Sequence, residues 1–457
     1  MPVSMLLVLA CLQAGQTQTT KVTQGPIQPL PPVGQQSSAS TPPPGPVTTA
    51  NGGSGAGGGG FDSPITVAEP DRIMITPRMD GKVVEEDWDP FTAGNGCRTY
   101  LQWVPGAIYA AGTGPVGDDM VVSLDLGADG WLVGANNLEV RLTNQNGTPS
   151  FTVNQLNAAN VSGPQWHPLP GFVLSSTVTA TSNEGVVTYT LRLSDPGYGF
   201  LPIKPTKIAA RIDFVPSGQP ASPPNAIRSL AALNLVQARS AVLPTDLKWK
   251  VEKTNKPFGP LDDATIKLDF TAAGKDAPTK MDIRAEGDVR DRMNESQVPF
   301  PPLDGKGNAS VDYTSKLSPG SEIGFHVLKA TITAADGTPG ILEASFRLAP
   351  MIDVSIPKPV LPLSATDRSV PLNFNIESFT QRPMQGTVTV TVPAPFKQVN
   401  GSPVQKFTLF DPYGKQKQKL EIFVPANTTG TFPISFELDI KKGGKFTYTR
   451  YLNIGPM

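Results

Sequence analysis

Residues 120–142 read Met120-Val-Val-Ser-Leu-Asp-Leu-Gly-Ala-Asp-Gly-Trp-Leu-Val-Gly-Ala-Asn-Asn-Leu-Glu-Val-Arg-Leu142. An aliphatic run at 120–124 is followed by a segment rich in Gly and Asp at 125–130, and a second aliphatic run lies at 138–142. Aliphatic runs separated by turn-forming residues are typical of neighbouring β-strands. We therefore expect a β-sandwich to be built around these residues.

The same pattern continues on the C-terminal side of this segment. In Val187-Thr-Tyr-Thr-Leu-Arg-Leu193 the apolar residues fall on one face of an extended chain, and Gly386-Thr-Val-Thr-Val-Thr-Val-Pro393 separates valines from threonines in the same way. Alternation with a period of two residues indicates antiparallel strands that bury one face. The sequence thus predicts an all-β protein made of several β-sandwiches.

Length and composition agree with several domains and few helices. A chain of 457 residues exceeds the size at which one hydrophobic core stops growing. Its 48 Pro and 44 Gly favour strands, turns and linkers over helices. The 38 basic and 39 acidic residues nearly cancel, so the chain lacks the strong positive field that nucleic-acid binding requires.

The N-terminal part resembles an export leader followed by a linker. Residues 1–14 contain the apolar stretch Met5-Leu-Leu-Val-Leu-Ala-Cys-Leu12, which is typical of a signal peptide and too short to cross a bilayer as a helix. Cys11 ends Val8-Leu-Ala-Cys11, which is similar to a lipoprotein box, so lipidation of Cys11 and cleavage near Ala14 are alternatives. Residues 15–60 are rich in Gln, Thr, Pro and Gly and predict a disordered tether. We expect a secreted, cell-surface or periplasmic protein, which contacts a membrane only if Cys11 carries a lipid anchor.

Three sandwiches are expected after the tether. The first is predicted at 61–242, and immunoglobulin-like sandwiches of about a hundred residues are predicted at 246–350 and 351–457. Near the end of the first sandwich, Ile227-Arg-Ser-Leu-Ala-Ala-Leu-Asn-Leu-Val236 fits either a short helix or a last strand.

Residues 73–215 resemble family 9 carbohydrate-binding modules and their DOMON-like relatives, and the two later domains are similar to bacterial surface sandwiches. The resemblance rests on the order of Asp80-Gly81, Trp88, Trp103, Ile108-Tyr109, Asp118-Asp119, Ser123-Leu-Asp125 and Asp129-Gly-Trp131. It implies a non-catalytic β-sandwich that holds a sugar between tryptophan faces and carries structural calcium. This chain has Ala135-Asn-Asn137 where that family usually has an acidic pair.

Three aromatic residues in predicted loops are candidates for sugar binding. A pyranose ring stacks its C–H faces on an indole and needs polar groups for its hydroxyls. Trp131, Trp166 and Tyr198 occur beside Gly, Pro and polar residues, where their rings would face solvent. The alternative is that these rings cap the sandwich core. Trp88 and Trp103 lie among strand-like residues and are expected in the core.

The turn after residue 124 also offers oxygen ligands. Asp125, Asp129 and Asn137 carry the oxygen atoms that calcium prefers, so we expect them to be the ligands if structural calcium is bound. Asp and Asn are also ordinary turn residues, and a solvated turn is the alternative.

The sequence predicts no catalytic site. His167 and His326 are the only histidines, and neither a Gly-x-Ser-x-Gly elbow nor a His-Glu-x-x-His motif is present. We therefore expect an exported, non-catalytic protein that binds a polysaccharide or a cell-envelope glycan. The alternatives are a structural or adhesion protein of the cell envelope and an accessory subunit of a glycan-degrading enzyme.

Overall fold

The structure is a computed structural model of the chain. Its described residues are 67, 70–84, 88–94, 97–131, 133–157, 165–219, 229–241, 247–251, 257–259, 263–272, 280–286, 296–299, 301–316, 323–333, 337, 339–441 and 443–455. The expected leader at 1–14, with Cys11, and the expected linker at 15–60 lie outside the described residues.

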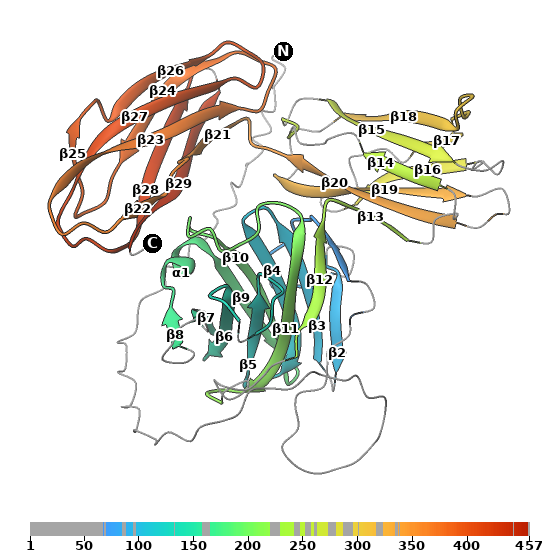
Figure 1. Ribbon diagram of the computed structural model, residues 1–457, viewed down its shortest axis with the longest axis horizontal. Coiled ribbons are helices and arrows are strands. Elements are labelled where there is room, and N and C mark those ends of the chain that lie inside the picture. Colours follow the sequence, from blue (N-terminus) through green and yellow to red (C-terminus); the bar gives the residue numbers. More distant parts are fainter. Residues whose placement is uncertain are drawn as a thin grey trace, which may run out of the picture. The chain divides into compact units, whose positions relative to one another are not determined.

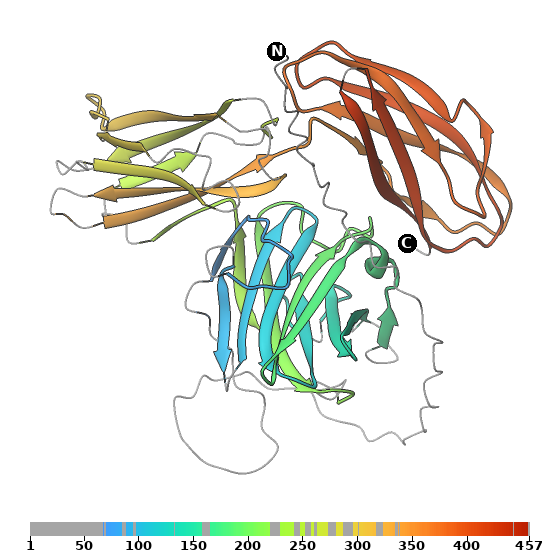
Figure 2. The same ribbon diagram turned by 180° about the vertical axis from the view of Figure 1, so that it is seen from behind.

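The prediction of an all-β protein is confirmed. Among the described residues, twenty-nine strands form six sheets, and the helical segment is the single turn α1 (Gly171–Ser175). Figures 1 and 2 show the strands of the first sandwich from opposite sides.

The first sandwich contains a seven-stranded and a five-stranded sheet. The seven-stranded sheet has the order β1-β12-β11-β5-β6-β7-β8, and the five-stranded sheet has the order β2-β3-β4-β10-β9. Their bounds are β1 (Asp71–Ile73), β2 (Pro90–Gly94), β3 (Cys97–Val104), β4 (Ala107–Pro115), β5 (Asp118–Asp125), β6 (Asn137–Gln145), β7 (Thr148–Asn157), β8 (Gln165–Pro168), β9 (Thr177–Asn183), β10 (Val186–Ser194), β11 (Thr206–Pro216) and β12 (Ala231–Val236).

The facing sides of these two sheets form the main core. Alternate residues of β5, β6 and β10 point into it, among them Val122, Val140 and Leu191, all at most 1% exposed. Trp103 lies in the same core at 0% exposure, and its indole Nε1 donates a 2.6 Å hydrogen bond to the carbonyl of Arg72.

The outer face of the five-stranded sheet carries a second, smaller core. Trp88, at 1% exposure, packs there with Tyr100 and Tyr109, and the segment before β2 adds Met79 and Val83. Since both faces of the sheet are covered at β3 and β4, these two strands are buried almost without alternation. The expectation that Trp88 and Trp103 are core residues is confirmed.

The boundary between the first and second sandwiches lies at Gln237, five residues earlier than the sequence suggests. Residues 231–236 form β12 of the first sandwich, which settles the choice between helix and strand at that point in favour of a strand. The next strand, β13 (Ala238–Ala241), pairs with β20 of the second sandwich. The predicted first domain at 61–242 therefore includes a strand of its neighbour.

The second sandwich consists of a five-stranded sheet, β13-β20-β19-β16-β17, and a three-stranded sheet, β14-β15-β18. The bounds of its remaining strands are β14 (Leu247–Val251), β15 (Asp263–Ala272), β16 (Lys280–Glu286), β17 (Ser296–Pro299), β18 (Asn308–Lys316), β19 (Gly324–Thr333) and β20 (Pro339–Leu348).

The third sandwich consists of a four-stranded sheet, β21-β23-β27-β25, and a five-stranded sheet, β22-β29-β28-β24-β26. Its strands are β21 (Ile352–Ser355), β22 (Val360–Pro362), β23 (Arg368–Ser378), β24 (Met384–Thr391), β25 (Lys397–Asn400), β26 (Val404–Leu409), β27 (Lys415–Val424), β28 (Gly430–Ile440) and β29 (Gly444–Gly455).

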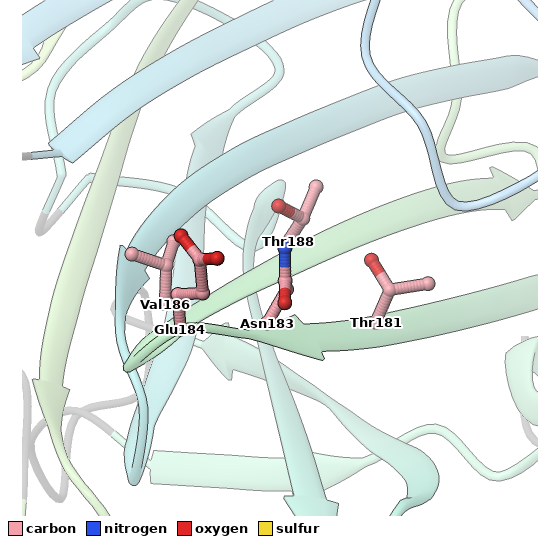
Figure 3. Close-up of a pocket in the computed structure, with 5 residues that line it drawn as sticks. All are labelled: Thr181, Asn183, Glu184, Val186 and Thr188. Carbon is pink, nitrogen blue, oxygen red and sulfur yellow. The ribbon is translucent and has the colours of Figure 1, made fainter.

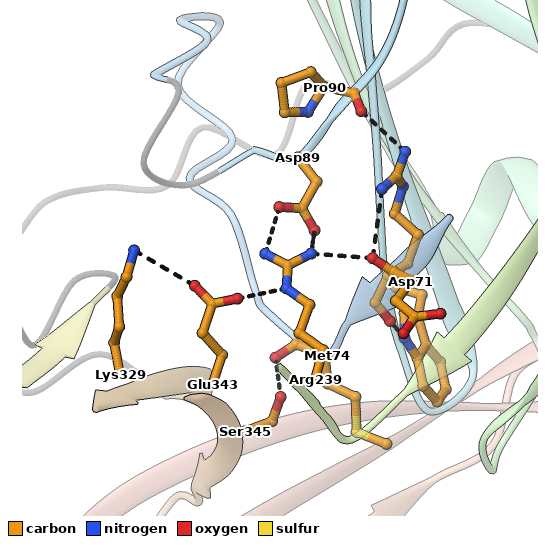
Figure 4. Close-up of polar contacts among 10 residues, drawn as sticks. Asp71, Met74, Asp89, Pro90, Arg239, Lys329, Glu343 and Ser345 are labelled. Atoms are coloured by element: carbon orange, nitrogen blue, oxygen red, sulfur yellow. Dashed lines mark hydrogen bonds and ion pairs between the residues drawn. The ribbon is translucent and has the colours of Figure 1, made fainter. Parts of the chain in front are cut away.

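Polar side chains hold the first two sandwiches together. Arg239 on β13 forms ion pairs with Asp89 of the first sandwich and Glu343 of the second, as Figure 4 shows. Ser345 Oγ also donates a hydrogen bond to the carbonyl of Met74. Because one residue separates β12 from β13, these contacts replace a flexible linker at this junction.

Candidate functional site

Four side chains form one row on the outer face of the seven-stranded sheet. Asp125 on β5 pairs with Asn137 on β6, Asn137 pairs with Leu156 on β7, and Leu156 pairs with Trp166 on β8. Paired residues share a face of a sheet, so the row runs across four adjacent strands. The topology thus brings two of the three predicted metal residues, Asp125 and Asn137, and one predicted aromatic residue into the same row.

The β5–β6 loop covers this row. Asp125 is 2% exposed, and its carboxylate oxygens accept backbone N–H bonds from Gly127 (3.1 Å) and Gly130 (2.8 Å), which fix the start of the loop. Trp131 follows, with its ring centroid 6.1 Å from that of Trp166 at an angle of 51°. The loop therefore reaches the edge strand β8.

Burial of Trp131 changes the predicted mode of sugar binding. We expect this ring to face solvent, but it is only 4% exposed, and it packs against the ring of Trp166. A centroid separation of 6.1 Å is a direct contact between rings, so no sugar fits between the two tryptophans. Trp131 is a support for Trp166, and the expectation of an open ring at residue 131 is wrong.

Trp166 is the aromatic residue that remains accessible. It is partly exposed on β8, where Gln165 and His167 on either side of it are exposed. β8 is the edge strand of its sheet, so no further strand of the sheet lies beside Trp166 on that side. The carboxamide of Gln155, on β7, is tied to the β5–β6 loop by a 2.5 Å bond from Nε2 to the carbonyl of Ala135.

Tyr198 belongs to a different cluster. Its ring packs against Phe172 and Phe200, with centroid separations of 5.6 and 6.1 Å. Its hydroxyl lies 2.9 Å from Thr431 Oγ1 of the third sandwich. Tyr198 is therefore a contact between sandwiches, and it is separate from the tryptophan pair that the sequence groups it with.

Two side-chain oxygens of the β5–β6 loop lack a hydrogen-bond partner. Asn137 is fully buried, and its Nδ2 donates to the carbonyl of Val133 at 2.9 Å while its Oδ1 accepts no bond. The buried Oδ1 of the neighbouring Asn136 is unpaired as well. Buried acceptors in native proteins are almost always paired, so these two atoms are exceptions within this part of the first sandwich.

Asn136 is absent from the predicted site, and the structure adds it. The sequence signal was present in the Asn136-Asn137 doublet after Gly134. That doublet is equally typical of a plain turn, so position alone does not separate the two roles. Asp129, a predicted ligand, is exposed on the same loop.

The arginines of the outer face are engaged in other bonds. Arg141 Nη1 lies 2.8 Å from Asp119 Oδ2, and its Nη2 donates to the carbonyl of Gln219 at 2.6 Å. Arg211 pairs with Asp213 at 2.8 Å. The loop segment 126–137 contains no Lys, Arg or His, so the charged side chain it contributes is the carboxylate of Asp129.

A shallow hollow lies on the other sheet, at the β9–β10 hairpin (Figure 3). Its volume is about 320 Å³, and it is lined by Thr181, Asn183, Glu184, Val186 and Thr188. None of the described residues that line this hollow is aromatic, so they offer no platform for sugar stacking, and the hollow is distinct from the Trp166 surface.

Groups typical of catalysis are scattered. Among the described residues, no three His, Cys, Asp or Glu side chains form a group that could hold a metal ion. His167 is exposed on β8, whereas His326 is buried on β19 of another sandwich. Within the same described residues, no helix has the length and apolar character needed to cross a membrane.

Comparisons with known proteins assign neither a family nor a function. No family model and no curated protein matches the chain. Among solved structures, red sea bream transglutaminase is 14% identical over 47% of this chain and 32% of its own, with a TM-score of 0.26. Escherichia coli alpha-2-macroglobulin activated by porcine elastase is 12% identical over 79% and 33%, also with a TM-score of 0.26.

A putative membrane anchored protein from Corynebacterium diphtheriae is 10% identical over 78% of this chain and 89% of its own, with a TM-score of 0.20. This chain spans about a third of the length of the transglutaminase and the alpha-2-macroglobulin. Because all three TM-scores are below 0.5, the function has to be argued from the geometry of the chain itself.

Proposed function

We propose that the chain is an exported, non-catalytic protein whose first sandwich binds a polysaccharide or cell-envelope glycan on the outer face of its seven-stranded sheet. The observation that carries this proposal is the Trp131–Trp166 pair, in which a buried indole supports a partly exposed one on an edge strand. The proposed cell-surface or periplasmic location rests on the leader-like residues 1–14.

A supported indole is well suited to bind sugar. A ring that is already fixed loses little side-chain entropy when a sugar stacks on it. The contact with Trp131 restricts the rotamers of Trp166 before any ligand binds, so this entropic cost is reduced. Successive side chains of a strand point to opposite faces, so the polar residue that shares the outer face with Trp166 is the partly exposed Asn154 of β7, whose amide is of the kind that hydroxyl recognition needs. Stacking takes place on one face of Trp166, which favours a ligand that lies along the surface over one enclosed in a pocket.

Affinity electrophoresis and a glycan array with the full chain test this proposal. We expect Trp166→Ala to weaken binding at least tenfold, about 1.4 kcal/mol, because the stacking platform is lost. The matched control is Phe410→Ala, which removes a 78% exposed aromatic residue from the third sandwich and is expected to leave binding unchanged. Equal binding by the wild type and Trp166→Ala would refute the assignment of the site.

A structural or adhesion protein of the cell envelope is the second candidate. It is favoured by the side-chain bonds that join the sandwiches, such as Arg239–Asp89 and Tyr198–Thr431, since these stiffen the chain without serving a ligand. Failure of the wild-type chain to bind any glycan would favour this second function over the first.

A further inference from the structure

We propose that the chain forms a two-fold symmetric dimer in which the free edge of β9 pairs antiparallel with β9 of a second copy. β9 is the last strand in the described five-stranded sheet, and its other side pairs with β10. The dimer joins the five-stranded sheets of two chains into one continuous sheet. The inference is independent of glycan binding, because Trp166 lies on β8 of the other sheet.

The backbone of β9 has hydrogen-bonding groups available for this pairing. Glu184 and Gly185 form a two-residue turn with φ angles of 49° and 79°, which makes Asn183 and Val186 the hydrogen-bonded pair that closes the β9–β10 hairpin. Hydrogen bonding alternates along an antiparallel strand, so every second residue of β9 directs its N–H and C=O away from β10. No strand in the described part of the chain pairs with β9 on that side. The residues that face this free side are Val178, Ala180 and Ser182.

β9 lacks the features that keep an edge strand from pairing with another chain. Prolines, charged side chains and bulges are such features. The seven residues of β9, Thr177-Val-Thr-Ala-Thr-Ser-Asn183, contain no proline and no charged side chain, and their pairing with β10 has no bulge. Every other edge strand of the described sheets contains a proline or a charged side chain. These strands are β1, β2, β8, β13, β14, β17, β18, β21, β22, β25 and β26.

The charge pattern favours a second copy as the partner. In a two-fold antiparallel pair centred on Ala180, this residue lies opposite its own copy, and Thr179 lies opposite Thr181 of the other chain. A charged side chain in β9 would then lie near the same charge of the second copy, and like charges across a strand pair are destabilising. Residues 142–183 contain no Asp, Glu, Lys or Arg, so no such repulsion opposes the pair.

Sedimentation velocity of the full chain over a range of concentrations tests this proposal. We expect a reversible equilibrium between monomer and dimer. Ala180→Pro removes an outward N–H and keeps the bonds between β9 and β10, so it should raise the dissociation constant of the dimer at least tenfold. The matched control is Lys406→Pro on the edge strand β26. The carbonyl of Lys406 accepts a bond from Gln418 of the other sheet, so its N–H also points outward, and the control should dimerise as the wild type does.

Two double variants change side chains and leave the backbone intact. In the proposed register Thr177 of one chain lies opposite Asn183 of the other, and both side chains are exposed. Thr177→Glu/Asn183→Glu places like charges opposite each other and should weaken the dimer at least tenfold. Thr177→Glu/Asn183→Lys places opposite charges there and should dimerise at least as tightly as the wild type. Thermal melts check that each variant is folded.

Three outcomes overturn the proposal. A wild-type chain that stays monomeric at every concentration does not pair through β9. A dimer that folded Ala180→Pro leaves unchanged uses another surface of the chain. Equal association of the two double variants excludes the two-fold antiparallel register centred on Ala180.

Discussion

Arg239 and Asp89 form a two-bonded ion pair across the junction of the first and second sandwiches. The guanidinium Nη1 and Nη2 lie 2.8 and 2.9 Å from the two carboxylate oxygens, and both side chains are 17% exposed. The same guanidinium donates through Nε to Glu343 at 2.5 Å and through Nη1 to the carbonyl of Asp71 at 3.0 Å (Figure 4). The N–H groups of Arg239 thus form hydrogen bonds to residues of both sandwiches.

We expect Arg239→Met to lower the free energy of unfolding by about 3–5 kcal/mol, because it leaves Asp89 and Glu343 in a partly buried place without their partner. Urea denaturation measures this loss. In the double variant Arg239→Met/Asp89→Asn the loss should be smaller than the sum of the two single losses. The control Lys445→Met breaks an exposed pair with Asp439 and should cost under about 1 kcal/mol. Equal losses in Arg239→Met and Lys445→Met would show that the junction does not depend on Arg239.

Tyr189 gives the first sandwich a distinct response to alkaline pH. Burial raises the pKa of its hydroxyl to about 12 from an ordinary value of 10, and the carboxylates of Asp119 and Asp118 add to the shift. The hydroxyl donates a 3.0 Å hydrogen bond to the carbonyl of Asp118. The folded chain therefore keeps this proton at a pH at which the unfolded chain has lost it.

The stability that this proton contributes is fully present below pH 10 and is lost as the pH rises towards 12. The expected slope is at most about 1.4 kcal/mol per pH unit for this one group. Tyr189→Phe should lose some stability at neutral pH, with its hydrogen bond, and show a smaller decline between pH 10 and 12. Urea midpoints at several pH values measure both effects, and parallel curves for the two proteins would contradict the assignment.

The strand pattern of the fold is visible in the sequence, whereas contacts between distant segments are not. Alternation in 187–193 and 386–392 predicts the strands β10 and β24, because side-chain direction along a strand is a local property. The domain boundary at Gln237 cannot be predicted from the sequence, since no Pro or Gly separates β12 from β13 there.

The candidate site is predicted only in part for a similar reason. Asp129 lies in the expected loop and Asn137 begins β6, but Trp131 is buried against Trp166, which is 35 positions away in the chain. Tyr198 meets Thr431 in another sandwich. Local patterns identify a loop aromatic residue without showing which surface it will meet.

Asp195 organises the loop that carries Tyr198. Its Oδ1 accepts backbone N–H bonds from Gly197 (2.8 Å), Tyr198 (2.6 Å) and Gly199 (3.2 Å), and its Oδ2 accepts one from Leu201 (2.9 Å). The loop then contacts the third sandwich.

We expect Asp195→Ala to free residues 195–201 and to weaken their contacts with the third sandwich, because four backbone donors lose their acceptor. Hydrogen exchange should rise at least tenfold in this loop and also near Asn453, whose Nδ2 donates to the carbonyl of Pro196. The control Asp367→Ala removes the acceptor of one backbone bond, from Ala426, and should affect only that turn. Faster exchange confined to 195–201 would mean that the junction is held by other residues.

Phe214 requires glycine on the facing strand. A Cβ at Gly114 of β4 would lie 2.3 Å from Phe214 Cδ1, and a Cβ at Gly112 would lie 2.8 Å from Phe214 Cε2. The ring thus lies directly over the two glycines, between the two sheets of the first sandwich, with Tyr189 beside it at a centroid separation of 6.3 Å.

Gly114→Ala is expected to lower the stability of the first sandwich by about 1–3 kcal/mol, because the ring has to leave its rotamer or the sheets have to separate. Gly455→Ala is the matched control, since a Cβ at this other strand glycine meets no atom within 4 Å. If the clash is the cause, Phe214→Leu should make the chain more tolerant of Gly114→Ala, so that the double variant loses less than the sum of the single losses in urea denaturation. Additive losses would instead point to the backbone of β4, since a clash relieved by a smaller side chain cannot be additive.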